Sequence, residues 1–178
     1  MLEREMSSGL RYDSLYYGFY FGMPAKDFYD HCWAMNKKGW FRQGATNNTV
    51  YAKITELKYP GNINFYPTFY ENKIAGMPTT FAYEGWSPWN KKLSADSLKL
   101  DVLNLMEKWY GKGFIPIKNP NKFGTTTDAY VKIDGNRRIS IYNTNDISVM
   151  VDFIDLTKKD QMEELVAAKK RERTQKNE

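Results

Sequence analysis

The residues that most often carry out chemistry are scarce in this chain. The only histidine, His31, precedes the only cysteine, Cys32, and such a pair could supply a base and a nucleophile. Neighbouring residues on a helix point about 100° apart, so these two side chains would not face each other. Cys32 also falls on the apolar stripe of the helix predicted there, and no third residue is placed to orient the histidine. We therefore interpret Cys32 as a small core residue.

Aspartates near predicted strand ends are the remaining candidates for acid–base or metal chemistry: Asp128, Asp134, Asp152 and Asp155. An odd separation puts Asp152 and Asp155 on opposite faces of a regular strand, and Asp134 is accounted for by a turn. One histidine and one cysteine cannot complete a zinc site without carboxylates. The chain has no phosphate-binding loop, nucleophile elbow or dinucleotide-binding motif. The sequence predicts no metal and no cofactor, and favours a protein that is not an enzyme.

Two tryptophans are the strongest candidates for a binding surface. Trp86 and Trp89 flank a Ser-Pro pair in a predicted loop. Aromatic rings carry a disproportionate share of interface energy, and Pro88 would present them with little freedom to lose on binding. The alternative is that both rings close one end of the core. We interpret this loop as the place where a partner docks, and the exposure of the rings decides between the two interpretations.

Two arginines form the second candidate binding site. Arg137 and Arg138 follow a predicted hairpin turn, where their guanidinium groups could hold an anion. The alternative is a solvated hairpin end in which one arginine pairs with a nearby carboxylate.

Nucleic-acid association is the second hypothesis for the function. Strand tyrosines could stack on bases, namely Tyr51, Tyr66, Tyr70, Tyr130 and Tyr142. The net charge of +5 is concentrated at the end of the chain, because residues 169–178 hold five basic and two acidic side chains, a net +3. The rest of the chain carries only +2, so nucleic acid is the less favoured partner.

Two helices that could position these side chains have clear boundaries in the sequence. Pro24 suits the first turn of a helix whose apolar residues recur at helical spacing up to Gly39. Ser94 or Asp96 can begin a second helix, with one apolar stripe that ends before Gly111. A capping-box-like start at Thr157 predicts a last helix that frays into the basic tail.

Alternating patterns predict the strands. They cover residues 15–21, 50–55, 63–70, 74–83, 129–133, 138–142 and 147–153. Asp134-Gly135 is a strong hairpin signal, Glu71 to Lys73 is a second predicted turn, and Pro67 indicates an edge or a bulge. The predicted fold is α+β, an antiparallel sheet with helices packed on one face, and the element order indicates two α-β-β-β units.

The chain resembles an uncharacterised family of bacterial proteins over roughly residues 9–156. The motifs that carry the resemblance are YGFYFGMP (residues 17–24), FYDHCW (28–33), FYP (65–67), WSPWN (86–90) and DGNRR (134–138). The family implies no established activity and no site residues. Some of its members carry a hydrophobic segment upstream, which implies the cell envelope. The element order is also similar to small envelope lipoproteins and to the β-lactamase-inhibitor-like fold, which implies a binding protein.

These observations predict a single domain over residues 1–156, followed by a C-terminal helix and basic tail over 157–178. The leading hypothesis is a non-enzymatic binding or structural module that recognises a protein or an envelope component. No stretch approaches the roughly 20 apolar residues of a membrane helix. We expect the cell envelope as its location if an anchor precedes residue 1 in the natural protein, and the cytoplasm otherwise.

The tail is predicted to be dispensable for folding. Apolar periodicity ends at Val166, and the charged residues that follow have little to bury. Deleting residues 169–178 should leave the thermal midpoint nearly unchanged in calorimetry. Loss of cooperative unfolding on deletion would show that the tail belongs to the core.

Overall fold

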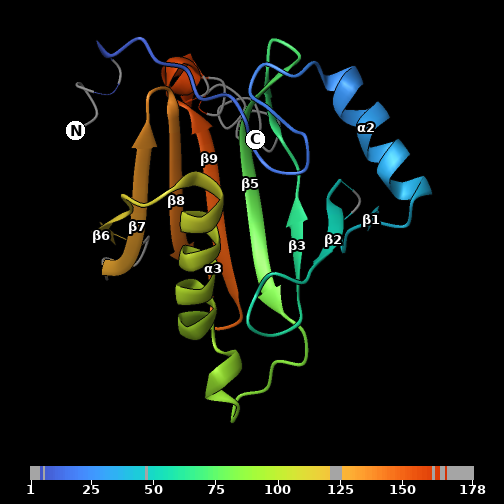
Figure 1. The fold of residues 1–178 in the computed structure, drawn as a ribbon, viewed down its shortest axis with the longest axis vertical. Helices are drawn as coiled ribbons and strands as arrows, with labels where there is room; N and C mark the ends of the chain where they lie inside the picture. Colours follow the sequence, from blue (N-terminus) through green and yellow to red (C-terminus); the bar gives the residue numbers. More distant parts are fainter. Residues whose placement is uncertain are drawn as a thin grey trace, which may run out of the picture.

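The computed structural model describes residue 5, residues 7–46, 48–120 and 126–161, and residues 163, 164 and 167. Within these residues an antiparallel nine-stranded sheet has the order β1-β2-β3-β5-β9-β8-β7-β6, and β4 pairs with β5 outside that path. Helix α3 lies across the central strands, while α2 lies beside β1 at one end (Figure 1). The predicted α+β fold is confirmed.

The elements have the following bounds. The helices are α2 (Ala25–Lys37) and α3 (Ala95–Tyr110), with 3-10 turns η1 (Lys91–Leu93) and η2 (Leu156–Lys158). The strands are β1 (Phe41–Gln43), β2 (Val50–Ile54), β3 (Gly61–Phe65), β4 (Thr68–Tyr70), β5 (Lys73–Tyr83), β6 (Ile115–Pro120), β7 (Thr126–Asp134), β8 (Arg137–Asn143) and β9 (Ser148–Asp155).

Both predicted helices form where their end signals place them. Helix α2 follows Pro24 and ends before Gly39, whose φ of +77° suits glycine. Helix α3 begins at Ser94, whose hydroxyl accepts the Ser97 amide proton, and it stops at Gly111. Its buried stripe of apolar side chains is turned toward the sheet: Leu98, Val102, Leu105 and Met106.

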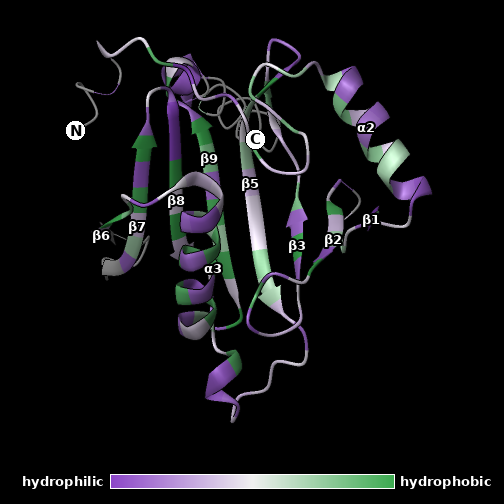
Figure 2. Ribbon diagram, viewed as in Figure 1, coloured by the Kyte–Doolittle hydropathy of each residue, from purple (hydrophilic) through white to green (hydrophobic). Residues whose placement is uncertain are grey.

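The core fills the space between the helices and one face of the sheet. Alternate residues of β5, β8 and β9 on this face are fully buried, among them Phe81, Ile141 and Phe153. Helix α2 reaches the same core because Phe28 packs on Phe19, 5.2 Å between ring centroids. Figure 2 shows hydrophobic segments on β7 and β9 and alternating hydrophobic and hydrophilic segments on α3, whereas α2 is largely hydrophilic.

The two halves of the chain repeat one order of elements. Each half is a helix followed by ladder strands, and the last strands, β5 and β9, pair at the centre of the sheet. At this seam Thr79 is opposite Val151, 72 positions later in the chain. Moving α2 by the same offset gives residues 97–109, which lie inside α3. Each half has four ladder strands rather than the predicted three, because β1 and β6 were not predicted.

Three local predictions are wrong. Residues 15–21 are a tight hairpin rather than a strand, because Tyr17 and Gly18 both have positive φ and reverse the chain. The predicted strand 63–70 is wrong as one continuous strand, because it divides into β3 and β4 around Pro67, but the register shift after Thr68 agrees with the irregularity predicted from Pro67. Asp155, rather than Thr157, is the capping residue of this region: it begins the 3-10 turn η2 and accepts from the Thr157 amide. Residues 168–178 of the predicted tail lie outside the described residues.

Asn136 fastens the N-terminal segment to the β7–β8 hairpin. This side chain is 3% exposed. Its carbonyl accepts the Tyr12 amide proton (2.7 Å), and its amide donates to Asp13 (3.1 Å) and Asp155 (3.3 Å). Because all three partners are distant in sequence, these bonds close a long loop onto the sheet.

Asn136→Ala should lower the free energy of unfolding by about 1–3 kcal/mol, because it leaves buried partners without hydrogen bonds. Urea denaturation monitored by circular dichroism measures this loss. The matched control is Asn104→Ala on the exposed side of α3, which should change stability by less than about 0.5 kcal/mol. Equal effects of the two substitutions would contradict the role of Asn136.

Candidate functional site

The predicted tryptophan pair is split between two environments. Trp86 is half-buried, whereas Trp89 is 85% exposed. Trp86 lines a cavity of about 320 Å³ between its loop and the start of α3. Trp89 does not close one end of the core. Its ring is exposed, as the docking interpretation of this loop requires. Docking itself stays a prediction.

Arg137 is a buried structural residue as well as a candidate binding residue. Its guanidinium donates to Asp134 (3.0 Å) and to the backbone carbonyl of Ser14 (2.6 Å). It also lies 4.6 Å from the ring centroid of Tyr110 and 5.6 Å from that of Tyr12. At 6% exposure, Arg137 is not part of a solvated hairpin end.

Arg138 lies on the other face of the sheet. Strand alternation separates it from Arg137, which stacks on Tyr110 at the end of α3. The structure therefore does not bring the two guanidinium groups together on one anion. The charge of Arg138 instead acts on Asp152, which lies between Pro78 and Ser140 on the uncovered face.

The strand tyrosines do not form one stacking platform. Registers place Tyr51 and Tyr142 in a single transverse row on the uncovered face. Tyr130 pairs with Ile141 on the helix-covered face, and the hydroxyl of Tyr66 bonds that of Tyr29.

The N-terminal hairpin has an unusual backbone, and among the described residues Glu71 and Asn72 are the other non-glycine residues with positive φ. Tyr17 (φ +53°) and Gly18 (φ +84°) are the central residues of a turn closed by the Phe19 amide, which donates to the Tyr16 carbonyl (3.1 Å). This left-handed conformation suits Asn or Gly and is rare for a bulky side chain. His31 holds the turn by donating from Nε2 to the Tyr17 carbonyl (2.8 Å). The turn directs the Tyr17 ring against Trp109, 6.3 Å between centroids.

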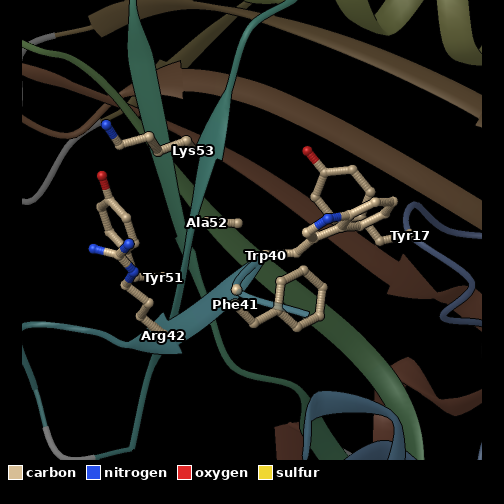
Figure 3. Close-up of a pocket in the computed structure, with 8 residues that line it drawn as sticks. Tyr17, Trp40, Phe41, Arg42, Tyr51, Ala52 and Lys53 are labelled. Carbon is tan, nitrogen blue, oxygen red and sulfur yellow. The ribbon is translucent and has the colours of Figure 1, made fainter. Parts of the chain in front are cut away.

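A cleft of about 550 Å³ opens beside this turn, and we call it the Tyr17 cleft. Its lining residues are Ser14, Leu15, Tyr16, Tyr17, Glu56, Trp109, Tyr110 and Arg137. They come from the N-terminal hairpin, the segment after β2, the end of α3 and the start of β8. A smaller cavity of about 260 Å³ shares Tyr17 and extends along β1 (Figure 3).

The end of α3 that forms one wall of the cleft is held by a buried lysine. Lys132 donates from Nζ to the carbonyls of Tyr110 and Gly111, and it also pairs with Asp134 (3.2 Å). An ammonium at a helix C-terminus satisfies carbonyls that lack partners within the helix and complements the helix dipole. Trp109 and Tyr110 are therefore fixed in position.

Glu56 supplies a carboxylate at the rim of the Tyr17 cleft. Its Oε1 accepts from the Lys108 ammonium (3.0 Å) and from the Trp109 indole (3.3 Å). No hydrogen bond to its Oε2 is found within the described part of the chain, so this oxygen can accept from a ligand. Burial raises the pKa of Tyr17, and the charge of Glu56 raises it further.

Two buried polar atoms of the lining residues lack partners. The Tyr110 hydroxyl and the Arg137 Nε make no hydrogen bond within the described residues. Burial raises the pKa of Tyr110, so this hydroxyl keeps its proton and can donate. Unpaired buried donors are rare in folded proteins and mark places where a further group can bind.

The geometry of His31 and Cys32 does not favour their acting as a base and a nucleophile. The imidazole is engaged by the Tyr17 carbonyl, and burial raises the pKa of Cys32 to about 12, so the thiol stays protonated. Cys32 is half-buried and packs against the core rather than within it, so the interpretation as a core residue holds only in part. Among the described residues no three His, Cys, Asp or Glu side chains gather as a metal site.

Comparison of the chain with models of protein families, with curated proteins and with solved structures finds no match. The resemblance to a bacterial family therefore stays a prediction. No helix in the described ranges is long and apolar enough to cross a membrane.

Sequence reasoning missed the Tyr17 cleft. Only Arg137 among its lining residues was a predicted binding residue, because the others come from three further segments that residue spacing cannot connect. One signal was available: Tyr17-Gly18 inside an aromatic run, where glycine permits a left-handed turn.

The ionisation of Asp152 should make stability depend on pH. Burial raises the pKa of Asp152 to about 6, and the charge of Arg138 opposes this. The folded chain therefore binds this proton more tightly than the unfolded chain, whose ordinary value is 3.8. Stability from this group is full at low pH and is lost as pH rises from about 4 to about 6.

Asp152→Asn should raise the free energy of unfolding at pH 7 by up to about 3 kcal/mol and have little effect at pH 3.5. Urea unfolding at both values measures the difference, with exposed Asp146→Asn as the control. A change of the same size at both pH values would show that the effect is not ionisation.

Proposed function

We propose that this chain is a non-enzymatic binding module and that the Tyr17 cleft holds its ligand. The observation that carries the proposal is the backbone of Tyr17. A non-glycine residue in the left-handed region costs about 1–2 kcal/mol, and residues held in such strain cluster at functional sites. Asparagine would relieve the strain but would not place a ring in the cleft.

The size and lining of the cleft support a small organic ligand. Sites for such ligands are apolar and aromatic hollows of roughly 300–1,000 Å³ with a few polar groups that fix orientation, and the Tyr17 cleft measures about 550 Å³. Tyr17, Trp109 and Tyr110 offer ring surfaces, while Glu56 and Arg137 offer an acceptor and donors. We infer a ring-bearing ligand with polar groups at its edge.

His31 and Cys32, the candidates for catalysis in the sequence, fit a binding protein better than an enzyme. His31 positions the Tyr17 turn, and the protonated Cys32 thiol is a poor nucleophile. The cleft lies on the helix-covered side of the sheet, whereas Trp89 is in the loop before α3. A small ligand and a protein partner could therefore be bound at separate places. An envelope origin for either stays a prediction.

Ligand-observed NMR tests the proposal with three ring-bearing polar probes, namely N-acetylglucosamine, tyramine and uridine. At least one should show saturation transfer from the protein. Tyr17→Asn should abolish that signal while the thermal midpoint stays within a few degrees, because asparagine suits the turn. Tyr17→Phe keeps the ring and should retain the signal at least in part.

Two results would contradict the proposal. One is that none of the three probes binds at millimolar concentration. The other is that a probe binds and Tyr17→Asn leaves its signal unchanged in a folded protein.

A further inference from the structure

Two indole rings and four cations gather at the end of the molecule formed by α2 and β1. We call this surface the aromatic–basic corner, and its residues are Trp33, Lys37, Lys38, Trp40, Arg42 and Lys53. Trp33 is 63% exposed and Trp40 is 66% exposed. Large apolar side chains exposed together usually mark an interaction surface.

The residues of the corner surround the edge strand β1 and the end of α2, and two cavities that share Arg42 connect them. Arg42 lines the cavity of about 330 Å³ that Trp33 borders between α2 and β1. Arg42 also lines the cavity of about 260 Å³ that contains Trp40 and Lys53. Lys37 extends over the Trp33 ring, 5.2 Å from its centroid. Figure 3 shows the Trp40 indole beside Tyr17 and places Arg42 and Lys53 on the opposite side of β1.

The charge of the corner is of one sign. Lys37, Lys38, Arg42 and Lys53 are all exposed. Within the described residues none of them forms an ion pair, in contrast to Lys26 and Lys108, which pair with acidic neighbours. An unneutralised cluster of this kind is complementary to an anionic partner.

An added β-strand does not suit this surface. The edge strand β1 has only three residues. Asn36 of α2 donates to the backbone carbonyl of Phe41 (2.9 Å), so part of the strand's backbone is already bonded. Natural sheets protect their edges with short strands and such coverage. The partner therefore contacts the side chains of the corner rather than extending the sheet.

We propose that the aromatic–basic corner binds the surface of an anionic lipid bilayer. Tryptophan favours the headgroup region, where its ring is in an apolar layer and its N–H can be hydrated. Basic side chains near that layer are attracted by anionic lipids. The corner lies at the end of the molecule opposite β6 and β7, which lets a flat surface reach it (Figure 1).

Single-stranded nucleic acid fits the corner less well. Binding there requires open ring faces on which bases stack. The Lys37 ammonium already occupies one face of Trp33, whereas lysine and tryptophan side chains both favour a membrane interface. The lipid proposal does not depend on the Tyr17 cleft, so either can fail alone.

Vesicle co-sedimentation of the full chain tests this proposal. The probes are vesicles of phosphatidylcholine alone and of phosphatidylcholine with 30% phosphatidylglycerol, in 100 mM salt. Binding should be at least ten-fold stronger with phosphatidylglycerol and should shift tryptophan fluorescence to shorter wavelength. Both Trp33→Ala/Trp40→Ala and Lys37→Glu/Lys38→Glu should weaken it at least ten-fold.

Matched control variants separate the corner from general charge and aromaticity. Lys91→Glu/Lys92→Glu changes the net charge by the same amount as Lys37→Glu/Lys38→Glu, at exposed positions in η1. Trp89→Ala removes the most exposed indole of the described residues. Both should bind vesicles like the unaltered chain, and circular dichroism confirms that all variants fold. The basic C-terminal residues are identical in every variant.

Three outcomes would overturn the proposal. The first is no binding to phosphatidylglycerol vesicles. The second is an equal loss in the corner variants and their controls. The third is that a 20-nucleotide oligothymidylate binds as tightly as the phosphatidylglycerol vesicles or more tightly, and that the corner variants abolish this binding. That result would assign the surface to nucleic acid.

Discussion

The pairing of β5 with β9 is the interaction on which the rest of the structure depends. It joins the two halves of the chain along Gly76–Ala82 and Ser148–Ile154. Side chains from both strands enter the same core, including Phe81, Val149 and Phe153. Since α3 packs across this seam, neither half can bury its apolar face alone. Hydrophobic burial and long-range pairing are therefore gained together, which favours cooperative folding.

The Tyr17 cleft depends on that shared core. The Tyr16 hydroxyl shares a hydrogen bond with Thr79 of β5, and the Tyr16 ring packs on Phe153 of β9. This residue thereby anchors the N-terminal hairpin over the seam. The strained turn at Tyr17 persists because its neighbours are fixed on both sides. The position of a binding residue in this protein is thus determined by contacts far away in sequence.

Residues that mark the end of a helix or a tight turn were sufficient to predict the elements that contain them. Pro24, Ser94, Gly39 and Gly111 mark the helix ends, and Asp134-Gly135 marks the hairpin. Strands β1 and β6 lack such signals, because they are edge strands with little regular alternation of buried and exposed residues. Strand periodicity cannot reveal a turn that interrupts an aromatic run, which is why the Tyr17 hairpin was predicted as a strand.

The Tyr17 cleft and the aromatic–basic corner escaped sequence analysis for a different physical reason, while the predicted binding residues stay predictions. The exposure of a side chain and its distance from others depend on the tertiary structure. Residue type alone therefore cannot rank a loop tryptophan against a strand arginine as a binding residue. Arg137 and Arg138 are neighbours in sequence but lie on opposite faces of the sheet. Trp33 and Trp40 were assigned no role, yet both are largely exposed at the same end of the molecule. Alternation and spacing along the sequence therefore do not show which side chains share a surface.

The β5–β9 seam has the geometry of an isologous dimer interface, since equivalent edge strands of two similar units meet antiparallel. One such unit by itself would present a self-complementary edge and would associate in a concentration-dependent way. Joining two units in one chain makes that association intramolecular, at a high effective concentration. The two halves differ in what precedes them, since the hairpin that carries Tyr17 comes before the first half.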